Sequence, residues 1–153
     1  MKILIFADSH GSTQPMIDAV FTEQPGLVLH LGDHDSDCGG IREAFPDMMI
    51  RAVRGNCDRL SKEIENDEFV AEGKRIFMTH GHLYGVKFSL TNILGEAASR
   101  GADILLFGHT HRPVNKRENG IYVVNPGAAG TGGKTYAALE IERGAVNCVI
   151  KRA

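Results

Sequence analysis

Several short apolar runs in this chain end in a small residue that is followed by Asp, Asn or His. The segments at these ends are Asp8-Ser9-His10, Gly32-Asp33, Gly55-Asn56-Cys57-Asp58, Thr79-His80-Gly81-His82 and Gly108-His109-Thr110-His111. Apolar runs of strand length predict buried strands. Ligands bind at the carboxyl ends of the strands in an α/β sheet, because side chains that are distant in sequence meet there. We therefore expect these segments to converge in one crevice.

The order of the expected elements predicts an α/β fold. Strands are expected at residues 3–7 and 27–31, joined by a helix that Ser12 or Thr13 caps and that ends near Glu23. The remaining expected elements are helices near 40–45 and 90–100 and strands near 49–53, 68–71, 75–79, 104–107, 121–124, 136–142 and 145–151. The β-rich end is expected to be antiparallel. Together these elements predict a single domain, 1–153, folded as a four-layer α/β/β/α sandwich of two mixed sheets with outer helices.

Composition excludes several classes of protein. A chain of 153 residues that is 42% hydrophobic is long enough for one core, and its net charge of -2 with scattered Lys and Arg does not favour duplex nucleic acid or an anionic membrane as partner. The first apolar run is too short for a signal peptide or a membrane span. Cysteines at 38, 57 and 148 are odd in number and widely spaced, which favours a reducing compartment. We therefore expect a cytoplasmic protein.

The side chains at the strand ends are carboxylates, an amide and imidazoles. A single His at a strand end is more often a hydrogen-bonded structural residue than a ligand. Two imidazoles around one residue, as in Gly108-His109-Thr110-His111, are a stronger indication of a metal site. Oxygen and imidazole donors without a thiolate suit a pair of divalent cations such as Mn²⁺, Fe²⁺, Ni²⁺, Co²⁺ or Zn²⁺.

The order of these motifs resembles that of the calcineurin-like metallophosphoesterase superfamily. The matching motifs are D-x-H at 8–10, GD at 32–33, GN at 55–56, His80 and GHTH at 108–111, and the resemblance extends from residue 3 to about 130. The short length, the GNCD sequence and Asn125-Pro126-Gly127 make the chain most similar to small bacterial and archaeal phosphodiesterases of that superfamily. These enzymes also resemble a eukaryotic retromer subunit.

The resemblance implies a binuclear metal centre. Asp8, His10 and His111 would hold one ion. Asn56, His80 and His109 would hold the other, and Asp33 would bridge the two. Two divalent ions per chain are implied, manganese first, with Ni, Fe, Co or Zn as alternatives. A metal-bridging hydroxide would attack phosphorus in line, so no covalent enzyme intermediate is required.

The chain departs from the family at Cys57, where many members have a His that can protonate the leaving oxygen. A thiol is a poor substitute, because its reference pKa of about 8.5 leaves it an uncharged, weak donor at neutral pH. We expect Cys57 to be a packed small residue. Asp58 or His82 could supply the proton instead, although Asp58 could equally be a turn residue and His82 a plain loop residue.

Four other features receive structural interpretations. His34, Asp35 and Asp37 are expected to form a solvated acidic loop, and His30 to be a hydrogen-bonded interior histidine. The segment 133–135 resembles the end of a phosphate-binding loop, but a strand follows it, so a hairpin loop is expected. Asn125-Pro126-Gly127 is either a plain turn or a segment that presents backbone to the crevice.

The sequence thus predicts a metal-dependent phosphoesterase, more specifically a phosphodiesterase, whose partner is a small phosphate-ester substrate. Two alternatives stay open: a protein-interaction scaffold on the same fold, and a diesterase specific for nucleotides or cyclic nucleotides. All seven ligand positions match the family motifs, which favours catalysis over the scaffold. A homo-oligomer is compatible with the sequence, which does not determine the oligomeric state.

Overall fold

The computed structural model describes residues 1–130 and 132–153. Its strands are β1 (Lys2–Phe6), β2 (Leu27–His30), β3 (Ile50–Ala52), β4 (Asn66–Ala71), β5 (Lys74–Thr79), β6 (Ile104–Leu106), β7 (Val114–Glu118), β8 (Ile121–Asn125), β9 (Thr135–Glu142) and β10 (Ala145–Arg152). Its helices are α1 (Thr13–Glu23), α2 (Cys38–Ala44) and α3 (Thr91–Ser99), with short 3₁₀ turns η1 (Asp35–Asp37) and η2 (His82–Tyr84). Among these described residues, no helix has the length and apolar character needed to cross a membrane.

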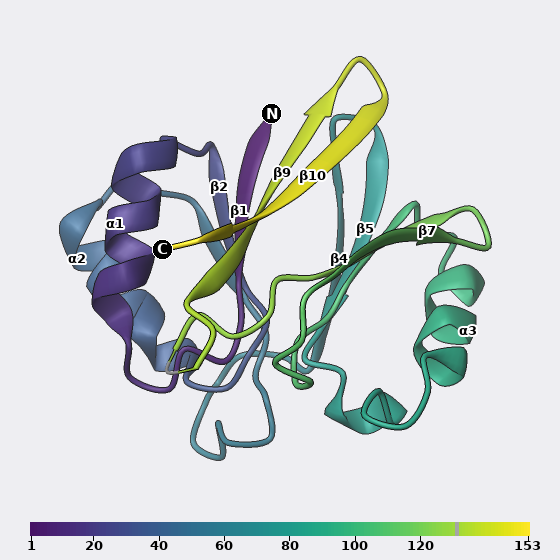
Figure 1. Cartoon of the computed structure of the whole chain (residues 1–153), viewed down its shortest axis with the longest axis horizontal. Helices are drawn as coiled ribbons and strands as arrows, with labels where there is room; N and C mark the ends of the chain where they lie inside the picture. Colours follow the sequence, from purple (N-terminus) through teal and green to yellow (C-terminus); the bar gives the residue numbers. More distant parts are fainter. Residues whose placement is uncertain (131) are drawn as a thin grey trace.

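The strands form two five-stranded sheets, in the orders β10-β9-β1-β2-β3 and β4-β5-β6-β8-β7. The sheets lie side by side in the middle of the molecule, with α1 and α2 on the outside of the first and α3 on the outside of the second (Figure 1). The predicted four-layer α/β/β/α sandwich of two mixed sheets is therefore confirmed.

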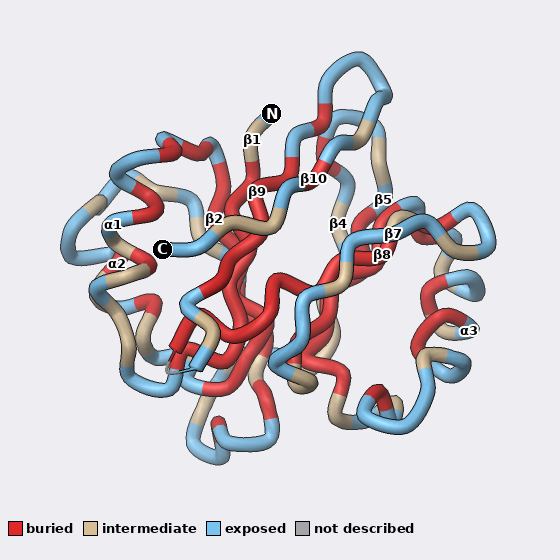
Figure 2. Tube along the Cα trace, in the orientation of Figure 1, coloured by how far each residue is buried: buried red, intermediate tan, exposed pale blue. Residues whose placement is uncertain are grey.

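The continuous apolar runs are explained by burial of the central strands on both faces. In β1, Ile3 and Ile5 pack into the core between the sheets, whereas Leu4 and Phe6 pack in the core beneath α1 and α2. In the second sheet the side chains alternate in the same way, and Phe77 faces the core beneath α3. Figure 2 shows these strands as buried, with exposed chain on the outer helices and loops. Alternate side chains point to opposite faces of a strand, so a strand covered on both faces is apolar throughout.

Each sheet contains three neighbouring parallel strands. These are β1, β2 and β3 in the first sheet and β5, β6 and β8 in the second. Their carboxyl ends lie at the lower edge of the molecule in Figure 1, where the loops of both sheets meet. All five predicted motif segments follow one of these strands, so the fold brings them to a common edge.

Some local expectations are wrong. The edge strand β7 was not expected, because its side chains are mostly polar and exposed. The expected antiparallel pairing of the tail is confirmed for β9 and β10, but β8 lies in the other sheet, where it pairs in parallel with β6 and antiparallel with β7. Ser12 occupies the first position before α1 but makes no capping hydrogen bond with its side chain. The other expected boundaries lie within two residues of the observed ones.

Two adjacent glycines of α2 provide a matched test of how this helix packs against α1. A Cβ at Gly39 would meet no atom within 4 Å, whereas a Cβ at Gly40 would collide with the Thr13 side chain. We expect Gly39→Ala to raise the free energy of unfolding by up to about 1 kcal/mol, because Ala favours the helix over Gly. Gly40→Ala should instead lower it by about 1–3 kcal/mol through overpacking. Urea unfolding of both variants measures the difference, and equal effects would contradict the packing described here.

Candidate metal centre

Two groups of potential metal ligands lie at the shared edge of the sheets. One contains Asp8, His10 and His111, and the other contains Asp33, His80 and His109; within each group the ligand atoms lie within 4.8 Å of one another. Asn56 joins the second group, because its Oδ1 lies 3.1 Å from His80 Nε2. The structure therefore brings all seven predicted ligand residues together, from loops that follow β1, β2, β3, β5 and β6.

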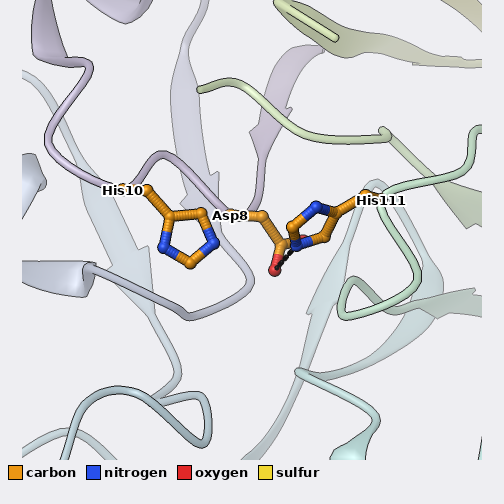
Figure 3. Close-up of side chains that lie close together, drawn as sticks. All are labelled: Asp8, His10 and His111. Carbon is orange, nitrogen blue, oxygen red and sulfur yellow. Dashed lines mark ion pairs between the residues drawn. The ribbon is translucent and has the colours of Figure 1, made fainter. Parts of the chain in front are cut away.

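Asp8 lies between the rings of His10 and His111 (Figure 3). It is fully buried, and its Oδ2 accepts a hydrogen bond from the backbone N–H of His109 at 3.1 Å. Its Oδ1 lies 3.2 Å from His111 Nε2 but accepts no hydrogen bond from any described residue. Burial, and after it the charge of Asp33, raises the pKa of Asp8 to about 7. A bound cation would stabilise the ionised form, so this buried oxygen is suited to metal binding.

His80 presents an unprotonated nitrogen to the centre of the site. Its Nδ1 lies 2.8 Å from the carbonyl oxygen of Leu31, which can only accept, so Nδ1 carries the proton. Burial lowers the pKa of His80 to about 4, and the ring is therefore neutral at pH 7. A backbone partner of this kind fixes the tautomer of a metal-binding His.

The lone pair of His80 Nε2 faces other electron-rich atoms. Asn56 Oδ1 lies 3.1 Å away and Asp33 Oδ1 3.5 Å away. His109 Nδ1 also lies at 3.1 Å, and it can donate at most one proton. Acceptors that converge at these distances repel one another unless a cation lies among them. The donor set of neutral imidazoles, carboxylates and an amide oxygen thus fits divalent metal ions.

Asp33 is held in place by the turn that contains Cys57. The N–H of Cys57 donates to Asp33 Oδ1 at 2.9 Å. Burial would raise the pKa of Asp33, but this hydrogen bond and the neighbouring His80 outweigh it and lower the pKa overall. A Cβ at Gly55 would come within 2.5 Å of the Asp33 backbone nitrogen, so only glycine allows this close approach. Asp33 is therefore an ionised, positioned carboxylate.

Asp58 lies beneath this loop rather than in either ligand group. Its buried carboxylate accepts the backbone N–H groups of Gly55, Asp33, His34 and Asp35, at 2.7, 2.8, 2.6 and 3.3 Å. A carboxylate with several N–H partners is strongly stabilised in its place. Asp58 thus joins the loops after β2 and β3 and positions Asp33.

Five of the seven predicted ligands have a left-handed backbone conformation. The φ angles of Asp8, His10, Asp33, His109 and His111 lie between 45° and 66°. This region is uncommon for residues other than glycine, and such strained residues cluster at functional sites where the surrounding structure imposes them. The surrounding structure therefore holds the backbone of these five residues in an uncommon conformation.

A partly buried hydrogen-bonded chain next to Asp8 was not predicted. Gly32 N–H donates to His30 Nδ1 at 3.2 Å, which leaves the proton on Nε2, 3.0 Å from Ser9 Oγ. Ser9 Oγ in turn donates to Asp37 Oδ2 at 2.7 Å, and Gly11 N–H donates to the same oxygen at 2.8 Å. The chain holds the loop that carries Asp8 and His10. No local sequence signal could have revealed it, because Ser9 is 21 positions from His30 and 28 positions from Asp37.

This chain corrects one expectation and supports another. His30 is fully buried and hydrogen-bonded, as predicted. The predicted solvated acidic loop is wrong for Asp37, whose carboxylate is bound by Ser9 and Gly11. His34 is exposed, with its ring centroid 5.1 Å from that of His10. Asp35 accepts a hydrogen bond from Ser61.

The residues considered as proton donors lie at different places around the site. His82 is half-buried, with its ring centroid 5.3 Å from that of His80 and a buried Nδ1 that has no hydrogen-bond partner among the described residues. Cys57 is exposed, so the expectation of a packed residue is wrong; it lies on the outside of a tight turn. Partial desolvation, and after it Asp33, raises the pKa of the Cys57 thiol. Cys57 therefore stays protonated at neutral pH.

The segment after β8 supports the GHTH loop. Asn125 is fully buried, and its Nδ2 donates to the carbonyl oxygen of Gly108 at 2.9 Å and to Thr110 Oγ1 at 3.1 Å. Its Oδ1 accepts the N–H of Gly127 at 2.9 Å. The segment is a turn that contacts the site loop through the Asn125 side chain. The hairpin-loop interpretation of 133–135 is wrong, because β8 and β9 lie in different sheets; a turn at 132–133 precedes β9, which begins at Thr135.

Comparison with known proteins agrees with this geometry. The family model described as "Calcineurin-like phosphoesterase superfamily domain" matches residues 1–144. The chain belongs to this superfamily. It is 32% identical over 131 residues to the probable metallophosphoesterase YsnB of Bacillus subtilis, with 84% of this chain and 75% of YsnB covered. It is 29% identical over 157 residues to the phosphodiesterase YfcE of Escherichia coli, with 84% and 79% covered.

Solved structures of the calcineurin-like fold are also similar to the chain. Wild-type Vps29 from Entamoeba histolytica, solved in complex with Zn²⁺, has a TM-score of 0.77 at 22% identity, with 99% of this chain and 98% of Vps29 covered. At this level of identity the likeness shows the fold alone. The chain is therefore a calcineurin-like phosphoesterase by sequence, with a fold that Vps29 shares.

The burial of His30 predicts how stability depends on pH. Burial lowers the pKa of His30 to about 4, whereas an unfolded His has a pKa of about 6.5. Between these values the unfolded state binds more protons at His30 than the folded state does. The contribution of His30 to the free energy of unfolding is therefore fully present above pH 6.5 and is lost as the pH falls towards 4. We expect His30→Gln to remove about 2 kcal/mol from the loss of unfolding free energy between pH 7 and pH 5. Urea unfolding of the metal-free protein tests this, and an unchanged pH slope in the variant would contradict it.

Proposed function

We propose that this calcineurin-like phosphoesterase is a phosphodiesterase that uses two divalent metal ions to hydrolyse a small phosphate ester. The observation that supports it most directly is the Oδ1 of Asp8, which has no hydrogen-bond partner among the described residues and is buried at the edge where the seven candidate ligand residues lie. A buried polar group without a partner costs free energy. Metal binding removes that cost.

The proposed ligands fall into two sets. Asp8, His10 and His111 would hold one ion, Asn56, His80 and His109 would hold the other, and Asp33 would be shared by both. We propose manganese as the native metal, with Ni, Fe, Co and Zn as alternatives, because oxygen and imidazole donors bind all of them. When bound, the two ions lower the pKa of the attacking water and neutralise charge on the phosphoryl oxygens.

The chain itself keeps its ligands in the required states. The Leu31 carbonyl holds the His80 proton on Nδ1 and thereby leaves Nε2 free. The Cys57 N–H holds Asp33 in position at 2.9 Å. If a side chain other than Cys57 protonated the leaving oxygen, His82 would suit this role better than Asp58, because both Asp58 oxygens already accept backbone N–H groups.

The location of the protein and the class of its partner are proposed from the sequence. We propose a cytoplasmic location and a small phosphate ester, not duplex nucleic acid or a membrane, as the partner. The three cysteines of the chain are free thiols in the structure, which suits a reducing compartment. A protein-interaction scaffold and a nucleotide-specific diesterase are the competing functions, and hydrolysis of a panel of mono- and diesters with each metal ion distinguishes them.

Replacement of the proposed bridging carboxylate tests the metal centre. Asp33→Asn keeps an oxygen that can accept the Cys57 N–H, but an amide cannot neutralise two cations. We expect bound metal to fall well below two equivalents and turnover to be abolished. Elemental analysis and a diesterase assay with Mn²⁺ measure both.

His34→Ala is the matched control, because His34 is the next residue but lies outside both ligand groups. It should leave metal content unchanged. An Asp33→Asn protein that retains two equivalents and the wild-type rate would refute the assignment. A wild-type protein that is inactive with every ion would favour the scaffold.

The exposed Cys57 thiol predicts a strong dependence on the leaving group. Without a strong acid at this position, kcat/KM should fall steeply as the pKa of the leaving group rises. Positioned proton transfer contributes about 10²–10⁴-fold, so Cys57→His should recover part of this for alkyl esters and change aryl esters little. The measurement is log kcat/KM against leaving-group pKa at saturating metal.

A shallow slope in the wild type, with chemistry rate-limiting, would show that another donor already acts. His82→Ala would then steepen the slope if His82 is that donor. Asp58→Asn is the comparison variant, and steepening there instead would assign the proton to Asp58.

A further inference from the structure

A cavity of about 440 Å³ lies beside the metal centre, and we call it the arm pocket. Its buried floor is formed by Val86 and Phe107, and the half-buried Leu90 and Val114 form its sides. Two exposed cations, Lys87 and Arg112, complete the lining. The pocket therefore combines an apolar interior with a cationic rim.

The arm pocket adjoins the loop that carries two of the proposed metal ligands. Thr110, which also lines it, is the residue between His109 and His111. A phosphoryl group at the metal centre would therefore have this pocket next to one of its ester oxygens.

The two cations of the rim are available for a ligand. Neither Lys87 nor Arg112 forms an ion pair with any described residue. The backbone of Arg112 is nevertheless held in place, because its N–H donates to Thr110 Oγ1 at 3.3 Å and the same Oγ1 accepts from Asn125 Nδ2 at 3.1 Å. The GHTH loop thus positions an unpaired guanidinium beside an apolar cavity.

We propose that the arm pocket binds one ester arm of the substrate and selects an arm with an apolar, ring-sized body that carries a second anionic group. The inference rests on the proposed phosphodiesterase function and specifies its substrate class. The volume lies within the range of about 300–1,000 Å³ that is common for small-molecule sites. The apolar floor would bury the ring, and Lys87 and Arg112 would pair with the anion.

Two synthetic diesters that differ in one carboxylate test this selection. They are p-nitrophenyl phenyl phosphate and p-nitrophenyl 4-carboxyphenyl phosphate, and both release the same p-nitrophenolate. With the Mn²⁺-loaded protein we expect kcat/KM to be about 3- to 10-fold higher for the carboxyphenyl diester, the range given by one or two partly exposed ion pairs. Equal values for the two diesters would overturn the proposal.

The double variant Lys87→Met/Arg112→Gln should reduce this ratio to about 1. Arg143→Gln is the control, because it removes a positive charge in the hairpin between β9 and β10, at the opposite end of the molecule from the site loops (Figure 1). It should keep the wild-type ratio. A ratio that persists in the double variant would mean that the metal centre, not the arm pocket, attracts the carboxylate, and would overturn the proposal.

A binding measurement separates this inference from the proposed function. In the metal-free protein, the methyl NMR signals of Val86, Leu90 and Val114 should shift with the carboxyphenyl diester at about 3- to 10-fold lower concentration than with the phenyl diester. If the metal-loaded wild type hydrolyses neither diester, the proposed function fails, and these shifts alone decide on the arm pocket. Absence of the shifts, or equal shifts with both diesters, would overturn the pocket even in an active enzyme.

Discussion

The hydrogen bond from His80 Nδ1 to the Leu31 carbonyl joins the two sheets at the edge where the site lies. It leaves the Nε2 lone pair directed towards Asn56 and Asp33, and burial keeps the ring uncharged. Candidate metal ligands from the first sheet meet those from the second sheet around this nitrogen. It is therefore the point at which the two halves of the site come together. A site assembled across two sheets therefore depends on their packing as much as on any ligand.

The loops at this edge are stabilised by hydrogen bonds to carboxylates that lie outside both groups of candidate ligands. Asp58 binds the backbone after β2 and β3, and Asp37 binds Ser9 and Gly11 next to Asp8. These hydrogen bonds offset part of the cost of left-handed backbone and of electron-rich atoms placed close together. The remaining cost is the repulsion between these electron-rich atoms, and a bound cation would relieve it. The metal-free protein is thus preorganised to bind cations.

A chain this short has few loops that could select a substrate. The loops after β5 and β6 supply both the imidazoles His80, His109 and His111 and the lining of the arm pocket. The candidate ligands from the second sheet and the pocket beside them therefore come from the same part of the chain. A calcineurin-like fold does not by itself determine a substrate, so we propose that the arm pocket selects it through Lys87 and Arg112, which have no ion-pair partner among the described residues.

The sequence alone determined the fold class, because strands that are buried on both faces have continuous apolar runs. It also determined which elements present the candidate ligands, because each motif directly follows one of these runs in the chain. The assignment of seven ligands to two ions stays a prediction, although the structure places them together. Only the tertiary structure revealed the polar edge strand β7, the parallel pairing of β8, the exposure of Cys57 and the chain from His30 through Ser9 to Asp37. Each of these depends on contacts between segments distant in sequence. Pairing partners, solvent exposure and long-range hydrogen bonds leave no periodic pattern in the residues themselves, so packing decides them.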